Sequence, residues 1–399
     1  MTTTDEPADP TPPVAGSVAE LTPTAMIAGG DAIARDHDGR VVFVNGALPG
    51  ERVRAEMVEV RPTYAMARLS EVLEPSPDRI RPPCPEIDRG CGACQWQHIA
   101  TDAQRRYKGD IVRDAVRRIG RFEPPELAST VELEPWDFRT TVRASVANGR
   151  AGFRRANSHD SVDVEGCLVA HPLIAELIVA ARYPGADEVL LRCGARTGER
   201  MAVVIPAAAS MTVPADVRSD HVHERAAGRS WQISADSFFQ TRADGVDALA
   251  DLVVNAADDL GAVTTAIDLY SGVGIFAGVL AARGWSVTAV ESSRSAVADA
   301  RVNLHDLDVA VVRNDVTKWT PRRADLVVAD PSRAGLGKRG VAAVVGAGAR
   351  RVILVSCDAA SLGRDAGLLR AAGYDLTSVI PVDLFPHTAH VEVVTIFDR

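Results

Sequence analysis

The sequence predicts an α/β protein in which a small β-barrel precedes a Rossmann-like, doubly wound parallel sheet. Residues 19–74 consist of short alternating apolar runs separated by Gly and Pro turns, which is typical of a barrel of about sixty residues. From about residue 262, apolar strands alternate with helical stretches, as in a parallel sheet covered by helices. The 399 residues are enough for two or three domains.

The N-terminal region begins with a segment that has no periodic pattern. Residues 1–18 are rich in Pro, Thr and acidic side chains, so we expect a disordered tail. In the barrel region, strands are expected at 41–44, 52–60 and 65–73. A group of prolines between 75 and 85 then marks a domain boundary.

The overall charge is acidic, with 53 Asp and Glu against 44 Lys and Arg and a net charge of −9. This balance argues against a general nucleic-acid coat protein, although it leaves room for a local basic groove. No apolar run approaches the ~18–20 residues that a membrane span needs. The first residues lack the basic segment and apolar core of a secretory signal. We therefore expect a cytoplasmic monomer with no membrane partner.

A helix is expected at 102–121, within a central α+β region that spans 75–225. Its apolar residues repeat at helical spacing: Ile111, Val112, Ala115, Val116 and Ile119. The other face carries basic residues: Arg105, Arg106, Lys108, Arg113, Arg117, Arg118 and Arg121. That face is either a solvated surface or a set of phosphate anchors, and the helix is a candidate to pack on the C-terminal domain.

The segment 265–291 predicts a nucleotide-type pocket. It reads as a strand, a glycine-bearing loop, a helix and a second strand, and Gly272 and Gly274 let the backbone approach a ligand closely. A dinucleotide site would have a third glycine where this chain has Ala277. The acidic residues near the strand ends suit S-adenosylmethionine (SAM), which has no pyrophosphate: Asp268, Glu291 and Asp315. A nicotinamide or flavin cofactor, or a tight turn without a ligand, is the alternative.

Two further residues adjoin apolar strands in the C-terminal half. Cys357 stands between a strand and the start of a helix, where the helix N-terminus is expected to lower the pKa of the thiol. The alternative is a small buried hydrophobic residue. Glu392 lies among valines, where apolar surroundings raise the pKa of a carboxyl group and suit it to proton transfer. The alternative for Glu392 is a charge at the rim of the last strand.

Four of the six cysteines suggest a metal site. Cys84, Cys91 and Cys94 follow the spacing C-x6-C-x2-C, and Cys167 comes much later in the chain. Zinc and a [4Fe–4S] cluster both accept four thiolates, so spacing alone leaves them equal. Disulfides are the third possibility, disfavoured in a chain without a secretory signal. Cys193 is expected to be a plain core residue.

Five runs of residues, in this order and spacing, resemble the SAM-dependent RNA uracil-5-methyltransferases, and in particular their iron–sulfur-containing ribosomal-RNA branch. They are FFQ (238–240), DLYSGVGIF, DPSRAG, VSCDAASLGRD and FPHTAHVE. The resemblance covers roughly residues 20–399. It implies a TRAM-like RNA-binding barrel at 19–74, a central domain with the cysteine cluster at 75–225 and a methyltransferase domain at 226–399.

The resemblance also implies roles for single residues. Uracil C5 is too weak a nucleophile to take the SAM methyl group directly, whereas addition of a thiolate at C6 makes C5 nucleophilic. The implied nucleophile is Cys357 and the implied base that removes the C5 proton is Glu392, with Asp330 against the uracil edge and the cofactor. The other implied contacts are a stacking ring and polar groups for base, cofactor and adenosine: Phe238, Gln240, Tyr270, Glu291 and Asp315.

The implied cofactors are SAM and a [4Fe–4S] cluster on Cys84, Cys91, Cys94 and Cys167, with zinc as the alternative. The implied partner is structured RNA, ribosomal before transfer RNA, anchored by the 102–121 helix and the barrel. The chain departs from the family pattern at Thr241-Arg242 and at 358–361, which bears on substrate fit. Two other functions remain: a SAM methyltransferase for a non-RNA acceptor, and a non-catalytic iron–sulfur RNA-binding protein.

Overall fold

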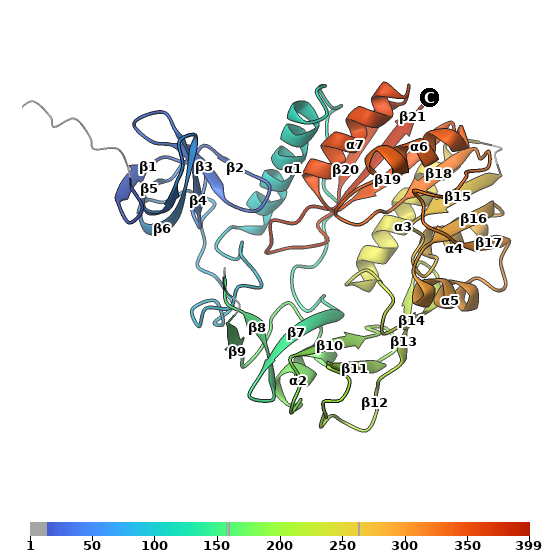
Figure 1. The fold of residues 1–399 in the computed structure, drawn as a ribbon, viewed down its shortest axis with the longest axis horizontal. Coiled ribbons are helices and arrows are strands. Elements are labelled where there is room, and N and C mark those ends of the chain that lie inside the picture. Colours follow the sequence, from blue (N-terminus) through green and yellow to red (C-terminus); the bar gives the residue numbers. More distant parts are fainter. Residues whose placement is uncertain (1–13, 157, 159, 262–263) are drawn as a thin grey trace, which may run out of the picture. The chain divides into compact units, whose positions relative to one another are not determined.

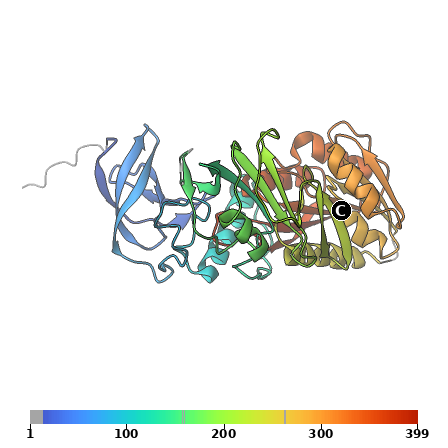
Figure 2. The same cartoon turned by 90° about the horizontal axis from the view of Figure 1, so that it is seen from below.

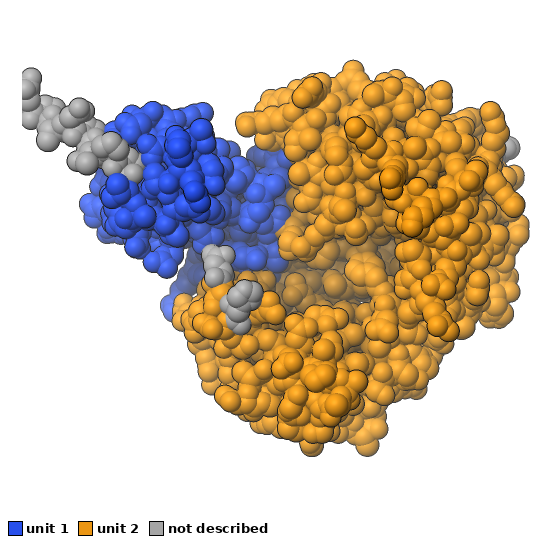
Figure 3. All heavy atoms as spheres, viewed as in Figure 1, with its two compact units in different colours: residues 1–82, 95–111, 387–389 blue, residues 83–94, 112–386, 390–399 orange. Residues whose placement is uncertain are grey.

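The structure, a computed structural model, describes residues 14–156, 158, 160–261 and 264–399. Figure 3 shows its two compact units: unit 1 comprises residues 1–82, 95–111 and 387–389, and unit 2 comprises 83–94, 112–386 and 390–399. The sequence suggested three parts after a tail. Within the expected central region, residues 75–82 and 95–111 belong to unit 1 and the other residues belong to unit 2.

Unit 1 is built on a six-stranded sheet in the order β1-β5-β6-β4-β3-β2, which is strongly curved (Figures 1 and 2). Inward and outward side chains alternate along β4, where Val42 and Val44 are fully buried and their neighbours are not. Most of the expected tail lies outside the described residues, and β1 begins at Val18. The strands are β1 Val18–Leu21, β2 Ala25–Met26, β3 Ala32–Arg35, β4 Val41–Asn45, β5 Arg52–Val60 and β6 Tyr64–Glu74.

Helix α1 spans Thr101–Arg118, not 102–121. The apolar stripe is buried from Ile111 to Val116, but Ile119 is 46% exposed and lies beyond the helix end. The expected basic face is also smaller than its sequence suggested, because Lys108 is only 5% exposed. Within the described residues, no helix is long and apolar enough to cross a membrane.

The first half of unit 2 contains a second six-stranded sheet, in the order β12-β11-β10-β7-β8-β9, with helix α2 beside it and the hairpin β13–β14 after it. Their bounds are β7 Thr141–Ala147, β8 Arg150–Arg154, β9 Ser161–Asp163, α2 Pro172–Val179, β10 Glu188–Cys193, β11 Arg200–Ile205, β12 Val217–Arg218, β13 His221–Ala226 and β14 Arg229–Ser234. The isolated Cys193 is buried in the core of this sheet.

The second half is a seven-stranded sheet in the order β17-β16-β15-β18-β19-β21-β20, which confirms the predicted α/β fold class. It is not wholly parallel, because β21 runs antiparallel to both β19 and β20. Helices α3 and α4 pack together, as do α6 and α7 (Figure 1). The bounds are α3 Ala243–Asp258, β15 Thr265–Leu269, α4 Ile275–Ala281, β16 Ser286–Glu291, α5 Arg294–Asn303, β17 Val309–Arg313, β18 Leu326–Ala329, α6 Gly337–Ala347, β19 Arg351–Ser356, α7 Ala359–Ala371, β20 Asp375–Pro381 and β21 Val393–Asp398.

Candidate active site

The residues that the sequence singled out in the C-terminal half follow the carboxyl ends of neighbouring parallel strands. β15 lies between β16 and β18, so the strand order reverses beside it. In open α/β sheets, ligands bind at such a switch point, outside the carboxyl ends of the strands. Tyr270, Glu291, Asp330 and Cys357 end or follow β15, β16, β18 and β19 respectively.

The loop after β15 depends on its left-handed residues. Tyr270, Gly272 and Gly274 all have positive φ angles, of 60°, 55° and 100°. A Cβ on Gly274 would lie 2.5 Å from the Leu304 side chain, so this glycine is needed for packing as well as for its conformation. A Cβ on Gly272 would meet nothing within 4 Å. The open space beside Gly272 therefore leaves its backbone accessible to a ligand.

Two carboxylates border this loop. Glu291 accepts hydrogen bonds from the backbone N–H of Gly272 at 3.0 Å and of Ser293 at 2.7 Å, which ties the ends of β15 and β16 together. The hydroxyl and backbone N–H of Thr317 lower the pKa of Asp315, so its carboxylate is ionised. Acceptors at these positions suit the hydroxyls and amino groups of an adenosine.

Asp268 is a further carboxyl group at this end of β15. It is fully buried, and its Oδ2 accepts the Ala277 N–H at 2.8 Å while its Oδ1 has no hydrogen-bond partner among the described residues. Burial, with smaller contributions from Asp330 and Glu291, raises the pKa of Asp268 to about 8. A buried polar oxygen without a partner is uncommon in proteins, so Oδ1 of Asp268 is a candidate contact for a polar ligand such as SAM.

A group of buried polar side chains lies next to the loop. Gln240, which is 6% exposed, donates from Nε2 to Oδ2 of Asp330 at 3.5 Å. Burial raises the pKa of Asp330 to about 7. Glu392 is 3% exposed, and burial together with the nearby Asp330 raises its pKa well above the ordinary value. Two carboxyl groups this close hold their protons more tightly than separate ones.

Cys357 lies within electrostatic reach of this acid pair, and its pKa corrects the sequence-based expectation. The thiol was expected to have a lowered pKa because α7 begins two residues later. Burial and the charges of Glu392 and Asp330 instead raise the pKa to about 11, and Arg333 opposes them only in part. Desolvation and two neighbouring anions outweigh the helix N-terminus.

Hydrogen bonds from α7 fix the loop that follows Asp330. Asp365, fully inside the protein, accepts the backbone N–H groups of Leu336 at 2.6 Å and Gly337 at 3.0 Å. At the start of α7, Asp358 caps the helix by accepting the Ser361 N–H at 2.7 Å. The departure from the family pattern at 358–361 thus preserves a helix cap. The supporting role of Asp365 was not found from the sequence, because its two partners are 28 and 29 residues away.

Phe238 stands out because its side chain is 66% exposed while its neighbours Phe239 and Gln240 are 4% and 6% exposed. An exposed ring beside buried polar groups suits the stacking of a flat ligand. The structure therefore brings Cys357, Glu392 and Asp330 together with Gln240.

The four cysteines assigned to a metal site come from two segments of unit 2, 83–94 and 112–386. Burial raises the pKa of Cys91 and Cys167, and the charges of Cys167 and Cys84 raise that of Cys91 further. Four thiols have the right donor chemistry for zinc or a [4Fe–4S] cluster. Their geometry does not yet fit, because no three Cys, His, Asp or Glu of the described residues are arranged to hold a metal ion.

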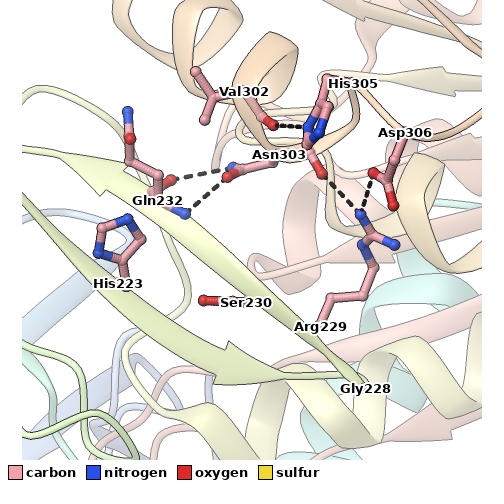
Figure 4. Close-up of a pocket in the computed structure, with 9 residues that line it drawn as sticks. All are labelled: His223, Gly228, Arg229, Ser230, Gln232, Val302, Asn303, His305 and Asp306. Carbon is pink, nitrogen blue, oxygen red and sulfur yellow. Dashed lines mark hydrogen bonds and ion pairs between the residues drawn. The ribbon is translucent and has the colours of Figure 1, made fainter.

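A separate cavity of about 380 Å³ lies between the hairpin β13–β14 and the end of α5 (Figure 4). Its charged residues are already paired, since Arg229 contacts Asp306 at 2.6 Å and His223 contacts Glu199 at 3.2 Å. None of the predicted site residues lines it. We therefore assign no ligand to this cavity.

Comparison with known proteins places these features in a family. Residues 20–70 match the TRAM domain family. A protein of Streptomyces avermitilis described as an RNA methyltransferase is 36% identical, over 95% of this chain and 97% of its own length. The 23S rRNA (uracil(1939)-C(5))-methyltransferase RlmD of Pectobacterium atrosepticum is 31% identical, over 92% of this chain and 91% of its own.

A solved structure shows the same fold. The tRNA (uracil-54, C5)-methyltransferase of Pyrococcus abyssi, in complex with S-adenosyl-L-homocysteine, has a TM-score of 0.76 and 22% identity, covering 95% of this chain and all of that one. These full-length relatives define the class of the protein as an RNA methyltransferase. With two relatives above 30% identity over nearly the full length, the chain belongs to the RNA uracil-C5-methyltransferase family.

Proposed function

We propose that the protein methylates C5 of a uridine in structured RNA, most simply ribosomal RNA, through a covalent bond between Cys357 and uracil C6. The observation that carries the proposal is the gathering of Cys357, Asp330, Glu392 and Gln240 at one end of the sheet, where burial raises the pKa of the three titratable groups. The name of the Pectobacterium relative supports ribosomal RNA.

When bound, SAM would supply the electrophilic methyl group that C5 accepts. Acceptors at Tyr270, Glu291 and Asp315 would hold its adenosine, with Gln240 and Asp330 on the side of the base. The ring of Phe238 stacks on the uracil taken out of the RNA fold. In this arrangement C6 of the uracil would lie against the Cys357 sulfur.

Proton movements follow from the pKa values. The Cys357 thiol, with a pKa of about 11, must give up its proton before Sγ bonds to C6. Asp330, whose raised pKa makes it a stronger base than an ordinary carboxylate once ionised, is assigned to accept this proton and pass it to solvent. After C5 has gained the methyl group, Glu392 removes the C5 proton, the Sγ–C6 bond breaks and the uracil double bond reforms. A carboxyl with a raised pKa is a stronger base once ionised.

Trapping with 5-fluorouridine RNA tests this proposal. Fluorine at C5 cannot leave as a proton, so the Sγ–C6 bond persists and the protein migrates with the RNA on a denaturing gel. Cys357→Ala must abolish the adduct, whereas Cys193→Ala, which alters a buried thiol in another core, must retain it. Methylation of a non-RNA acceptor without any RNA adduct would refute the assignment. Running ribosomal and transfer RNA fragments side by side identifies the substrate.

We propose that the last turn of α1 contributes to RNA binding. Arg117 and Arg118 have side chains that are 55% and 72% exposed, and both contact the single carboxylate of Asp114. Two guanidinium groups on one carboxylate leave a positive charge for a phosphate. Reversing both to Glu should weaken RNA binding and reduce its salt dependence by about one unit of log–log slope per lost phosphate contact. Unchanged binding and salt dependence would mean that these arginines belong to a solvated surface and do not contact RNA.

We propose a thiolate-bound metal centre, a [4Fe–4S] cluster before zinc, on the four clustered cysteines. The support is that Cys84 and Cys167 lie close enough to Cys91 to raise the pKa of its thiol, and a bound metal ion would stabilise the thiolates. Protein purified without oxygen should contain iron and sulfide and absorb near 400 nm. Cys94→Ser should lower the metal content, and Cys193→Ser should not. Protein that is free of both iron and zinc, whether isolated or reconstituted, would refute this proposal.

A further inference from the structure

A buried polar network lies behind the segment that presents Phe238. This segment follows β14 and runs from residue 235 to residue 240. The neighbouring side chains of Ser237 and Phe239 are buried, at 2% and 4% exposure, so the ring between them points outward. An exposed ring keeps this direction only if the backbone under it is fixed, because apolar groups otherwise collapse onto the surface.

Asp299 on α5 is the centre of the network and is fully buried. Its oxygens accept hydrogen bonds from the Gln232 side chain at 3.0 Å, from the N–H and hydroxyl of Ser234 at 2.9 and 2.7 Å, and from the Ser237 hydroxyl at 2.5 Å. Four donors occupy the acceptor sites of a carboxylate. Asp299 thus holds both ends of the turn between Ser234 and Ser237.

Arg192 on β10 contacts the same turn by donating hydrogen bonds to two backbone carbonyl groups of the turn. The guanidinium donates to the Ser234 oxygen at 2.8 Å and to the Ser237 oxygen at 2.9 Å, and the residue is 4% exposed. Burial lowers the pKa of Arg192 to about 10, and the charge of Asp299 opposes this shift. The side chain is therefore still charged at neutral pH, and two opposite charges act on one turn from two elements.

Asn303 strengthens the attachment of α5 to β14. Its side chain accepts the Gln232 N–H at 2.8 Å and donates to the Gln232 oxygen at 3.1 Å, as Figure 4 shows. The strand before the turn is thus joined to the helix that carries Asp299. The network ends at Ser237, one residue before the exposed ring.

From these contacts we propose that Asp299 and Arg192 are positioning residues that fix the turn 234–237 and thereby direct the ring of Phe238 toward the RNA base. The proposal rests on the function proposed above. Both residues act on the substrate only through the backbone of this segment. They are therefore needed for capture of the base and not for SAM binding.

Asp299→Asn is the first test. An amide NH₂ would face two of the four donors, so the turn loses at least one charge-assisted hydrogen bond, and kcat/KM for RNA should fall about tenfold or more. The affinity for SAM should change less than about twofold. The matched control is Asp306→Asn, which makes the same charge change at an exposed ion pair with Arg229 (Figure 4). A value of kcat/KM equal to that of the control would overturn the proposal.

A double-mutant cycle with Phe238→Ala separates positioning from a general loss of stability. If Asp299 acts through the ring, Asp299→Asn should change kcat/KM less than about twofold in a chain that already lacks the ring. A full tenfold loss in that background would mean that the network serves the fold as a whole, and would refute the proposal. If Asp299→Asn does not fold, Ser237→Ala replaces it in the same cycle, with an expected loss of about threefold from one neutral hydrogen bond.

The outcomes also separate this proposal from the one on which it rests. Failure of the wild-type protein to form a 5-fluorouridine adduct with any RNA refutes the function and the positioning role together. An adduct with normal kcat/KM in Phe238→Ala leaves the function standing and refutes the positioning role. A loss of kcat/KM in Phe238→Ala, together with a loss in Asp299→Asn that does not add to it, supports both the function and the positioning role.

Discussion

The thiol of Cys357 allows a quantitative test of the site's electrostatics in the free protein. Its pKa of about 11 lies two units above the ordinary 9.0, which corresponds to about 2.7 kcal/mol against the thiolate. At pH 8 the thiolate fraction is therefore roughly a hundredfold lower than for an ordinary thiol. A thiolate of higher pKa is more nucleophilic, by close to one order of magnitude for two units. The expected reaction rate with a small disulfide is thus about tenfold below that of an ordinary thiol.

The assay is the pH profile of mixed-disulfide formation at Cys357, followed by mass spectrometry of its peptide. Restricted access slows the reaction equally at every pH, so the midpoint of the profile reports the pKa alone. Glu392→Gln removes one anion and should move the midpoint down, yet keep it above 9 because burial is the larger cause. A wild-type midpoint at or below 9 would mean that the helix N-terminus dominates and would refute this reasoning.

Three further outcomes follow from the same site. Glu392→Gln should stop the reaction after methyl transfer, so that ordinary uridine RNA stays bonded to the protein on denaturing gels; normal turnover would contradict the role of the base. Glu291→Ala should weaken SAM binding about tenfold to a hundredfold in calorimetry, the loss expected for a charge-assisted contact, while Asp306→Ala should not. Asp268 has a folded pKa of about 8 against 3.8 unfolded, so the folded state holds its proton more tightly and loses stability as pH rises between these values. The Tm gained by Asp268→Asn should therefore grow from pH 5 to pH 8, and a gain independent of pH would contradict this.

Sequence patterns were sufficient where a local signal sets the structure. The alternation of strands and helices predicted the sheet, and the strand, loop, helix and strand expected over 265–291 are present as β15, α4 and β16. Because each of these strands is followed by its site residue, the carboxyl-end rule also brought Glu291, Asp330 and Cys357 together. The antiparallel direction of β21 was missed, since strand direction depends on the connection between β20 and β21 and not on composition.

Electrostatic properties were predicted less well because they depend on residues far apart in the chain. The helix N-terminus beside Cys357 is visible in the sequence, whereas the anions that oppose it come from residues 330 and 392. The basic face of α1 is smaller than the sequence suggested for a similar reason. Arg106, for example, contacts Asp78 at 2.7 Å, and helical periodicity gives no sign of that partner.

The departure at Thr241-Arg242 shows how such partners change the meaning of a substitution. Arg242 is 1% exposed, donates to both oxygens of Asp244 at 2.7 and 2.6 Å and lies 4.5 Å over the ring of Phe138. Gly245 has no room for a Cβ, which would lie 2.7 Å from the Arg242 side chain. An arginine enclosed in this way does not reach the RNA. Its neighbours Asp244, Gly245 and Phe138 accommodate it inside the protein, so this departure changes the interior of the protein rather than the surface that the substrate meets.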